Sequence, residues 1–275
     1  MKTRIITAIV AIAIFVPICI FSDYIVFPIA MAILSAVAVN EMARCLGFNK
    51  KLVLTIPMYL IAILLPISRF LLIKQSHFFM LAMISVFFML IYCLTYVMLR
   101  KNQDRINDVI TFYGLFVYIV GCFSSIVCVR YMAGGKYIYL LIFLGAWVCD
   151  TFAYFTGKFL GKHKLIPEIS PKKTVEGSIG GIVFTIIAFV IYGLIVNNNF
   201  GDKIQISYVL LVILGLASSI ISQIGDLVAS SIKRQYEIKD YGRLFPGHGG
   251  VLDRFDSVML VAPVTYIVFL IASVI

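Results

Sequence analysis

Hydrophobic residues run through this chain in long segments that short polar stretches separate. A helix needs about 20 mostly apolar residues to cross a bilayer, within a range of about 17 to 25. Nine segments reach or approach this length, at residues 5–22, 24–39, 52–68, 77–99, 109–129, 137–155, 179–196, 207–225 and 258–275. We therefore predict an all-α, polytopic integral membrane protein with about nine transmembrane helices.

The first segment has two interpretations. It follows the short basic sequence "MKTR", which is typical of secretory signal peptides as well as of membrane helices. Its apolar run is long and no clear cleavage site of small residues follows, so we interpret it as a retained helix. The second segment is the shortest, and only Asp23 separates it from the first.

The amino-acid composition is also typical of a membrane protein. Of the 275 residues, 62% are hydrophobic and 13% are charged, whereas soluble domains contain about 25% charged residues. The six cysteines are scattered without a C-x-x-C motif, so we interpret them as small apolar residues rather than metal ligands.

The distribution of positive charge predicts the topology. With a cytoplasmic N-terminus and nine spans, the external segments hold few of the 23 lysines and arginines, namely Arg69, Lys74, Arg130, Lys136 and Lys203. Because cytoplasmic loops of membrane proteins are enriched in Lys and Arg, we expect the N-terminus inside and the C-terminus outside.

The chain shows no internal repeat and no linker long enough to separate domains. We predict a single membrane-embedded domain over 1–275, with N-terminal helices that lack motifs at 1–136 and catalytic helices and cytoplasmic loops at 137–275. The longest polar stretches, 156–178 and 226–257, are too short for a soluble core. We therefore expect chemistry at the membrane surface.

Four carboxylates lie near the predicted cytoplasmic ends of their helices: Asp150, Asp226, Asp253 and Asp256. Ionisable residues in membrane spans are costly and are functional candidates by default. Asp226 also follows Ser222 by one helical turn, which places both on one polar face. We expect the carboxylates to converge around a cation. Alternatively, Asp256 caps the last helix, and Asp150 is a neutral, buried hydrogen-bonding residue.

Two loops offer groups that suit phosphate. The first, "ISPKKTVEGSIGG" at 169–181, begins with a Ser-Pro turn signal and contains Lys172 and Lys173. The second, "PGHGG" at 246–250, offers glycines whose backbone N–H groups can approach a phosphate closely. With the carboxylates, they predict a site for a polyphosphate and Mg²⁺. Alternatively, the basic residues are only topology signals and contacts to anionic lipid head groups.

The segment "SSIKRQYEIKDYGRLFPGHGGVLDRFDS", residues 230–257, resembles the signature of the phosphatidate cytidylyltransferase family, also called CDP-diacylglycerol synthases. The matching elements are Ser230, Lys233-Arg234, Lys239-Asp240, Pro246, His248-Gly249-Gly250, Asp253-Arg254 and Asp256. The stretches "SPKKTVEG", "CDTFAYFTGK" and "QIGD" resemble the family in the same order. The resemblance covers about 140–257 by motif.

The resemblance implies a reaction of CTP with phosphatidate that gives CDP-diacylglycerol and pyrophosphate. The implied catalytic residues are Asp226, Asp253, Arg254 and His248, and the implied metal ligands are Asp226 and Asp253, with Asp256 and Asp150 as further candidates. The implied contacts to CTP are Lys172, Lys173, Thr174, Gly249 and Gly250. Those to phosphatidate are Lys233, Arg234, Lys239, Arg243 and Ser222.

The same resemblance implies Mg²⁺ as cofactor, with a second cation left open. The expected partners are CTP, phosphatidate, membrane lipids and a second copy of the chain in a homodimer, with no nucleic acid. We expect a bacterial inner (plasma) membrane location, with the active site on the cytoplasmic face.

Other classes of protein make different demands on the sequence. A secondary transporter would use Asp150 and Asp226 as ion sites and would show repeated halves. A CDP-alcohol phosphotransferase would carry D-x-x-D-G-x-x-A-R, which "DRFDSVMLV" does not match. A scaffold that only senses anionic lipid would not need acidic residues beside a glycine loop.

The odd number of predicted spans places the two termini on opposite faces of the membrane. We expect a tag at the N-terminus and a tag at the C-terminus to be cleaved by protease from opposite sides of sealed vesicles. Equal cleavage of both tags from one side would contradict nine spans.

Overall fold

The structure is a computed structural model that describes residues 2–72, 74–100 and 104–272, with the backbone alone at 2–5 and 8. Its helices are α1 (Lys2–Ile20), α2 (Val26–Cys45), α3 (Leu52–Leu71), α4 (Gln75–Leu99), α5 (Ile106–Arg130), α6 (Gly135–Ile138), α7 (Leu140–Leu160), α8 (Val175–Phe200), α9 (Tyr208–Gln235) and α10 (Leu252–Ala272). Two short strands, β1 (Lys164–Ile166) and β2 (Ser170–Thr174), form a hairpin. The predicted all-α class is confirmed.

Eight helices among the described residues are long and apolar enough to cross a membrane, with α6 and α7 counted as one. They correspond to the predicted segments from the second to the ninth. The segment expected to be shortest is α2, which has 20 residues. The first predicted segment lies in α1, whose described apolar stretch is Ile9–Ile20. The chain is therefore a polytopic integral membrane protein.

Several helices continue beyond the apolar segments that predicted them. The α9 helix ends at Gln235 rather than at residue 225, and α10 begins at Leu252 rather than at residue 258. Hydropathy detects only the apolar part of a helix, whereas backbone hydrogen bonding continues into polar sequence. Asp226 and Asp256 consequently lie within helices. The last predicted segment includes residues 273–275, which lie outside the described part of the chain.

The chain forms two compact units, which we describe separately. The N-terminal unit contains the residues up to Cys128 together with Ile238–Arg254, and the C-terminal unit contains Val129–Glu237 together with the residues from Phe255 on. The boundary falls inside α10. Most of the signature segment therefore belongs with the N-terminal helices, in which we found no motif.

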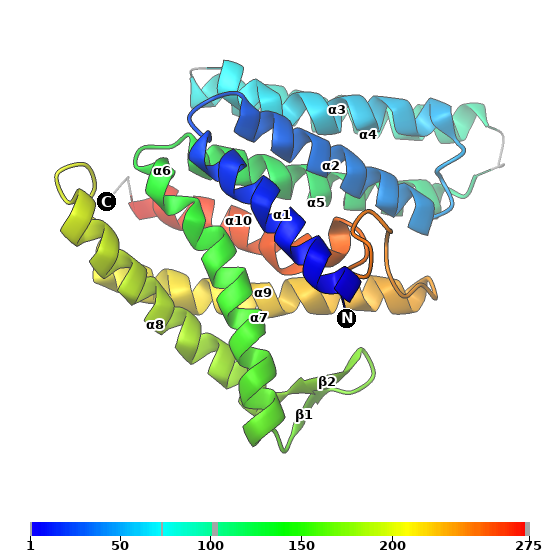
Figure 1. The fold of residues 1–275 in the computed structure, drawn as a ribbon. Coiled ribbons are helices and arrows are strands. Elements are labelled where there is room, and N and C mark those ends of the chain that lie inside the picture. The colour runs from blue at the N-terminus through cyan, green and yellow to red at the C-terminus, as the bar shows by residue number, and fades with distance from the viewer. Residues whose placement is uncertain (1, 73, 101–103, 273–275) are drawn as a thin grey trace. The chain divides into compact units, whose positions relative to one another are not determined.

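In the N-terminal unit, α2 packs against α3, and α3 packs against α4 (Figure 1). The core includes a stacked pair of rings, Phe48 and Phe112, whose centroids are 5.2 Å apart. Gly47 ends α2 with a φ of 75°, a left-handed conformation that glycine adopts without steric cost. The N–H of Phe48 then donates to the carbonyl of Ala43 at 2.7 Å.

In the C-terminal unit, α7, α8 and α9 pack against one another, and the β1–β2 hairpin extends from the end of α7 (Figure 1). The rings of Phe152 on α7 and Phe184 on α8 stack with centroids 4.1 Å apart.

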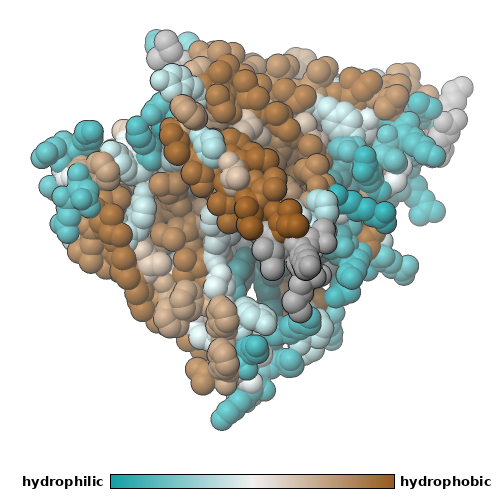
Figure 2. Space-filling view, in the orientation of Figure 1, coloured by the Kyte–Doolittle hydropathy of each residue, from teal (hydrophilic) through white to brown (hydrophobic). Residues whose placement is uncertain are grey.

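Hydrophobic residues cover the sides of the helices in Figure 2, and hydrophilic residues gather around loops and helix ends. Exposed side chains such as Met83 (71%), Phe88 (63%) and Val209 (69%) suit contact with lipid rather than with water.

A partly buried ion pair joins two loops of the N-terminal unit, with Asp104 buried and Lys51 half-exposed. Lys51, just before α3, pairs with Asp104, just before α5, and the Tyr96 hydroxyl donates to the same carboxylate at 2.9 Å. Burial alone would raise the pKa of Asp104, but hydrogen bonds from Lys51 and Tyr96 and the lysine charge outweigh burial and lower this pKa.

We predict that Asp104→Asn lowers the free energy of unfolding by about 1–3 kcal/mol at neutral pH, because it leaves Lys51 without its charged partner. Folding lowers the pKa of the Asp104 carboxyl. The ionised carboxylate therefore contributes to the free energy of unfolding at neutral pH, and this contribution is lost as pH falls below about 4. Thermal unfolding in detergent should show a difference between wild type and variant that shrinks in acid. A constant difference would contradict this assignment.

Candidate active site

The β1–β2 hairpin forms where we expected a Ser-Pro turn. The strands are antiparallel, with Lys164 opposite Thr174 and Ile166 opposite Ser170. Pro171 lacks an N–H donor, which an edge strand tolerates, and both strands of a two-stranded sheet are edges. The segment "SPKKT" is therefore extended, and α8 follows directly.

The extended backbone separates the two lysines. Successive side chains of a strand point to opposite faces, so Lys172 is exposed whereas Lys173 is partly buried. The Nζ of Lys173 lies 2.7 Å from Oδ2 of Asp226 and 3.4 Å from the carbonyl oxygen of Gln223. The structure thus brings Lys173 and Asp226 together, while Lys172 faces away from this pair.

Asp226 belongs to a polar stripe along α9. Ser219, the adjacent pair Ser222-Gln223, Asp226 and Ser230 follow one another at intervals of three or four residues, which places them on one face of the helix. The amide of Gln223 donates to the carbonyl oxygens of Ser219 (3.2 Å) and Ser178 (3.4 Å), and Ser230 donates to Asp226 at 3.4 Å. Ser222 is fully buried in this stripe.

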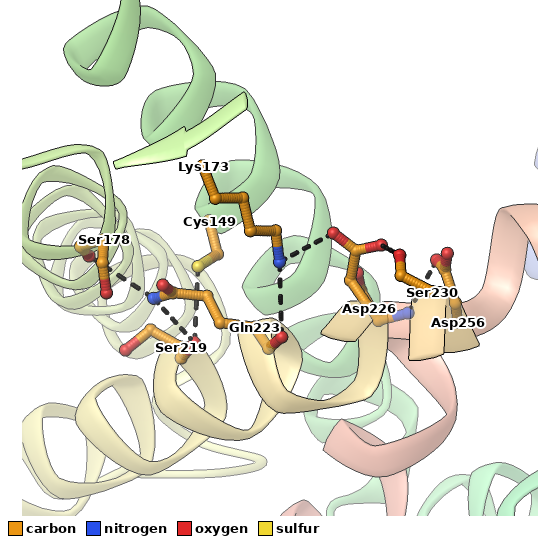
Figure 3. Close-up of polar contacts among 9 residues, drawn as sticks. Cys149, Lys173, Ser178, Ser219, Gln223, Asp226, Ser230 and Asp256 are labelled. Carbon is orange, nitrogen blue, oxygen red and sulfur yellow. Dashed lines mark hydrogen bonds and ion pairs between the residues drawn. The ribbon is translucent and has the colours of Figure 1, made fainter. Parts of the chain in front are cut away.

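Figure 3 shows Lys173 reaching toward Asp226, with Asp256 on α10 beside Asp226 and Ser230. Asp256 accepts a hydrogen bond from the N–H of Ser257 at 2.9 Å, and the charges of Asp226 and Asp150 both act on its carboxylate. Asp256 lies a full turn inside α10, so it does not cap that helix. Asp150 on α7 is exposed at the surface of the protein rather than buried within it.

These residues fit a site for Mg²⁺ completed by a substrate. Within the described ranges, no group of three or more His, Cys, Asp or Glu side chains is arranged to hold an ion. Mg²⁺ commonly uses one or two carboxylates together with substrate phosphates. Asp226 and Asp256 supply two carboxylates, and Lys173 adds a positive charge that suits phosphate.

Thr174 connects the hairpin to α8. Its hydroxyl accepts a hydrogen bond from the N–H of Gly177 at 3.1 Å, which makes Thr174 the N-cap of α8. Thr174 is 7% exposed, and a Cβ on Gly157, Gly161 or Gly177 would come within 2.9 Å of its hydroxyl oxygen. Thr174 therefore fixes the start of the helix immediately after Lys173.

The signature loop of the N-terminal unit folds back on itself. Phe245 donates to the carbonyl of Gly249 at 2.9 Å, and His248 donates to that of Phe245 at 2.8 Å. Gly247 and Gly249 have φ values of 76° and 85°, which favour glycine. Thr7 on α1 also donates to the carbonyl of Pro246 at 3.0 Å.

Two carboxylates accept backbone N–H groups on both sides of this turn. Oδ2 of Asp253 accepts from Gly250 at 2.9 Å and from Tyr241 at 2.8 Å. Glu41 on α2 accepts from Val251 and from Leu252, with both distances 2.9 Å. Val251 and Leu252 lie at the start of α10, where N–H groups lack partners within the helix and the helix dipole favours negative charge.

This pattern changes how we interpret the glycines of the loop. The N–H of Gly250 is already donated to Asp253, so it is not directed at a nucleotide in this conformation. A Cβ on Gly249 would lie 2.7 Å from Oδ2 of Asp253. The contacts to CTP predicted for Gly249 and Gly250 stay predictions. The Nδ1 atom of His248, however, is buried and has no hydrogen-bond partner among the described residues.

The remaining predicted residues lie on helix ends and loops. Lys233 and Arg234 occupy the last turn of α9, where positive charge complements the helix dipole. Arg234 is exposed, as are Lys239 and Arg243, which precede the glycine turn, and Arg254 in the first turn of α10.

Sequence analysis missed Glu41. The residue is 3% exposed, and an ionisable residue in a membrane helix is a functional candidate by default. The predicted span ended at residue 39, whereas α2 continues to Cys45, so Glu41 fell just outside it. A longer window over "AVNEMARC" would have identified this carboxylate.

Comparison with known proteins identifies the class. The chain matches the model of the cytidylyltransferase family over residues 2–272, and it belongs to that family.

Individual relatives show which members of the family the chain is similar to. The chain is 39% identical over 272 residues to the phosphatidate cytidylyltransferase of Bacillus subtilis (strain 168), covering 97% of this chain and 96% of the relative. It is 35% identical over 275 residues to the enzyme of the same name from Staphylococcus haemolyticus, covering 98% and 99%. The corresponding values for Staphylococcus aureus (strain COL) are 36% over 270 residues, 98% and 99%.

We predict that Thr174→Val destabilises the protein by about 1 kcal/mol, because Val keeps the branched shape but cannot accept the N–H of Gly177. The thermal midpoint in detergent should fall for Val and stay near wild type for Thr174→Ser. A Val variant as stable as wild type would show that the cap contributes nothing measurable.

Proposed function

We propose that this protein transfers CMP from CTP to phosphatidate and releases pyrophosphate. A phosphate oxygen of phosphatidate attacks the α-phosphorus of CTP, and the bond from that phosphorus to the oxygen bridging to the β-phosphate breaks. The observation that carries this proposal is the match, over almost their whole length, to relatives named for this activity, together with the signature at Ser230–Ser257.

The chemistry requires positioning and charge neutralisation more than a strong base. Phosphatidate is already an anion, so the enzyme has to align two negatively charged groups and stabilise the leaving pyrophosphate. The sequence favours Asp226 and Asp253 as ligands of Mg²⁺, with Asp256 and Asp150 as weaker candidates. Because one oxygen of Asp253 already accepts two backbone N–H groups, we propose that Asp226 and Asp256 hold Mg²⁺, with Asp253 and Asp150 as further candidates. When bound, Mg²⁺ would neutralise charge that develops on the nucleotide phosphates.

The residues of the chain have distinct tasks in this proposal. Lys173 is held by Asp226 with its ammonium group partly buried, and its charge suits a CTP phosphate. His248 has a buried ring nitrogen that is unpaired among the described residues, and we propose that it orients a phosphate. Arg254 acts on the transferred or attacking phosphate. Roles toward phosphatidate for Lys233, Arg234, Lys239 and Arg243 stay predictions, as do the cytoplasmic face and the homodimer.

The deciding experiment is turnover of labelled CTP by the purified protein in detergent, with phosphatidate and Mg²⁺. We expect label in the lipid phase only when both are present, and none with EDTA. No lipid-soluble label from folded protein supplied with Mg²⁺ would overturn the proposal, and transport assays would follow.

In the same assay, Asp226→Asn should lower turnover by about 10²-fold or more, because it removes a metal ligand and the partner of Lys173. The matched control is Asp202→Asn, which removes a carboxylate from the exposed loop between α8 and α9 and should retain activity. Near-normal turnover by a well-inserted Asp226→Asn protein would exclude Asp226 from the site.

A further inference from the structure

Glu41 is a buried carboxylate to which neither the signature nor the proposed chemistry gives a task. It lies on α2, in the half of the chain without motifs, and 210 residues separate it from Val251. Its two oxygens accept hydrogen bonds from two consecutive N–H groups, those of Val251 and Leu252, at 2.9 Å each. An arrangement with one oxygen on each donor fixes the orientation of the backbone as well as its position.

Two glycines close around the same carboxylate. A Cβ on Gly242 or on Gly250 would collide with Oε1 of Glu41. Both positions fall in the signature segment, on either side of the glycine turn. Contact with Glu41 therefore accounts for the lack of a side chain at both positions, without any ligand.

The held backbone carries the residues of the proposed function. Val251 and Leu252 lie between His248 and the pair Asp253-Arg254, and Asp253 bonds to Gly250 next to them. Asp253 and Arg44 are the neighbouring charged groups that act most strongly on Glu41. The two carboxylates therefore accept the N–H groups of three consecutive residues, Gly250, Val251 and Leu252, where the chain enters α10.

We propose that Glu41 is a positioning residue for the transfer reaction. It holds the turn between His248 and Asp253 so that both side chains and Arg254 keep the geometry needed for phosphate chemistry. This inference rests on the proposed function. It gives the N-terminal helices a direct part in shaping the signature loop.

The test uses Glu41→Gln in the full-length protein, with Asp108→Asn as a control that removes an exposed carboxylate of the same unit. Gln has nearly the same shape, but it can accept from only one of the two N–H groups and directs its NH₂ group at the other. We expect kcat to fall on the order of 10²-fold with little change in the apparent KM for CTP. The thermal midpoint should fall as well, because one buried N–H loses its acceptor. Asp108→Asn should behave as wild type.

A second readout does not depend on activity. Hydrogen–deuterium exchange of peptides covering 244–256 should be faster at Val251 and Leu252 in Glu41→Gln than in wild type. Unchanged exchange would overturn the proposal. Faster exchange with normal kcat would also overturn it, because the hydrogen bonds of Glu41 would then have no effect on turnover. An inactive wild type would instead refute the proposed function, while exchange would still decide whether Glu41 holds the loop.

A double-mutant cycle covers the case in which Glu41→Gln does not fold. Gly242→Ala should impair turnover in the wild type, because the methyl group meets the Glu41 carboxylate. The same change should cost much less in a Glu41→Asp background, where the shorter side chain still offers a carboxylate as acceptor but draws it back from Gly242. Additive effects would contradict direct contact between Glu41 and Gly242.

Discussion

Buried backbone N–H groups need acceptors, both at the start of a helix, where they have no partners within the helix, and in the loop before it. The signature loop meets this constraint with two carboxylates. Asp253 accepts from Gly250 and Tyr241, and Glu41 accepts from Val251 and Leu252. An unsatisfied buried donor costs about 1–3 kcal/mol, so four such groups could not stay unpaired. The conformation of the glycine turn, and with it the placement of His248, depends on these bonds.

Acidic residues organise the C-terminal unit in a similar way. Asp226 holds Lys173 in place, and the alternation of a short strand directs Lys173, rather than Lys172, toward α9. A carboxylate that orients a lysine and can also contact Mg²⁺ would couple binding of the metal to placement of the phosphate-binding cation. We infer that the two charges act together on the nucleotide.

Hydropathy predicted the class of fold and the approximate place of the membrane helices, because apolar runs of this length are rare outside membrane-spanning segments. It did not predict where polar helices end. The final ten residues of α9 and the first five of α10 are too polar for a membrane window, yet they carry Asp226, Asp253 and Asp256. Motif spacing identified these carboxylates, but it could not show that Asp253 bonds to backbone or that Thr174 is a cap. Neither hydropathy nor motif spacing predicted a role for Glu41, because the backbone groups that it binds are distant in sequence.

The separation of 210 residues between Glu41 and Val251 has a consequence for biosynthesis. Chains are made at about 5–20 residues per second, so Glu41 is synthesised on the order of 10–40 s before the backbone it binds. During that interval α2 carries an acidic group whose final donors do not yet exist. Water, lipid head groups or a chaperone of the insertion machinery must solvate it, and the N-terminal unit is completed only when almost the whole chain has been made.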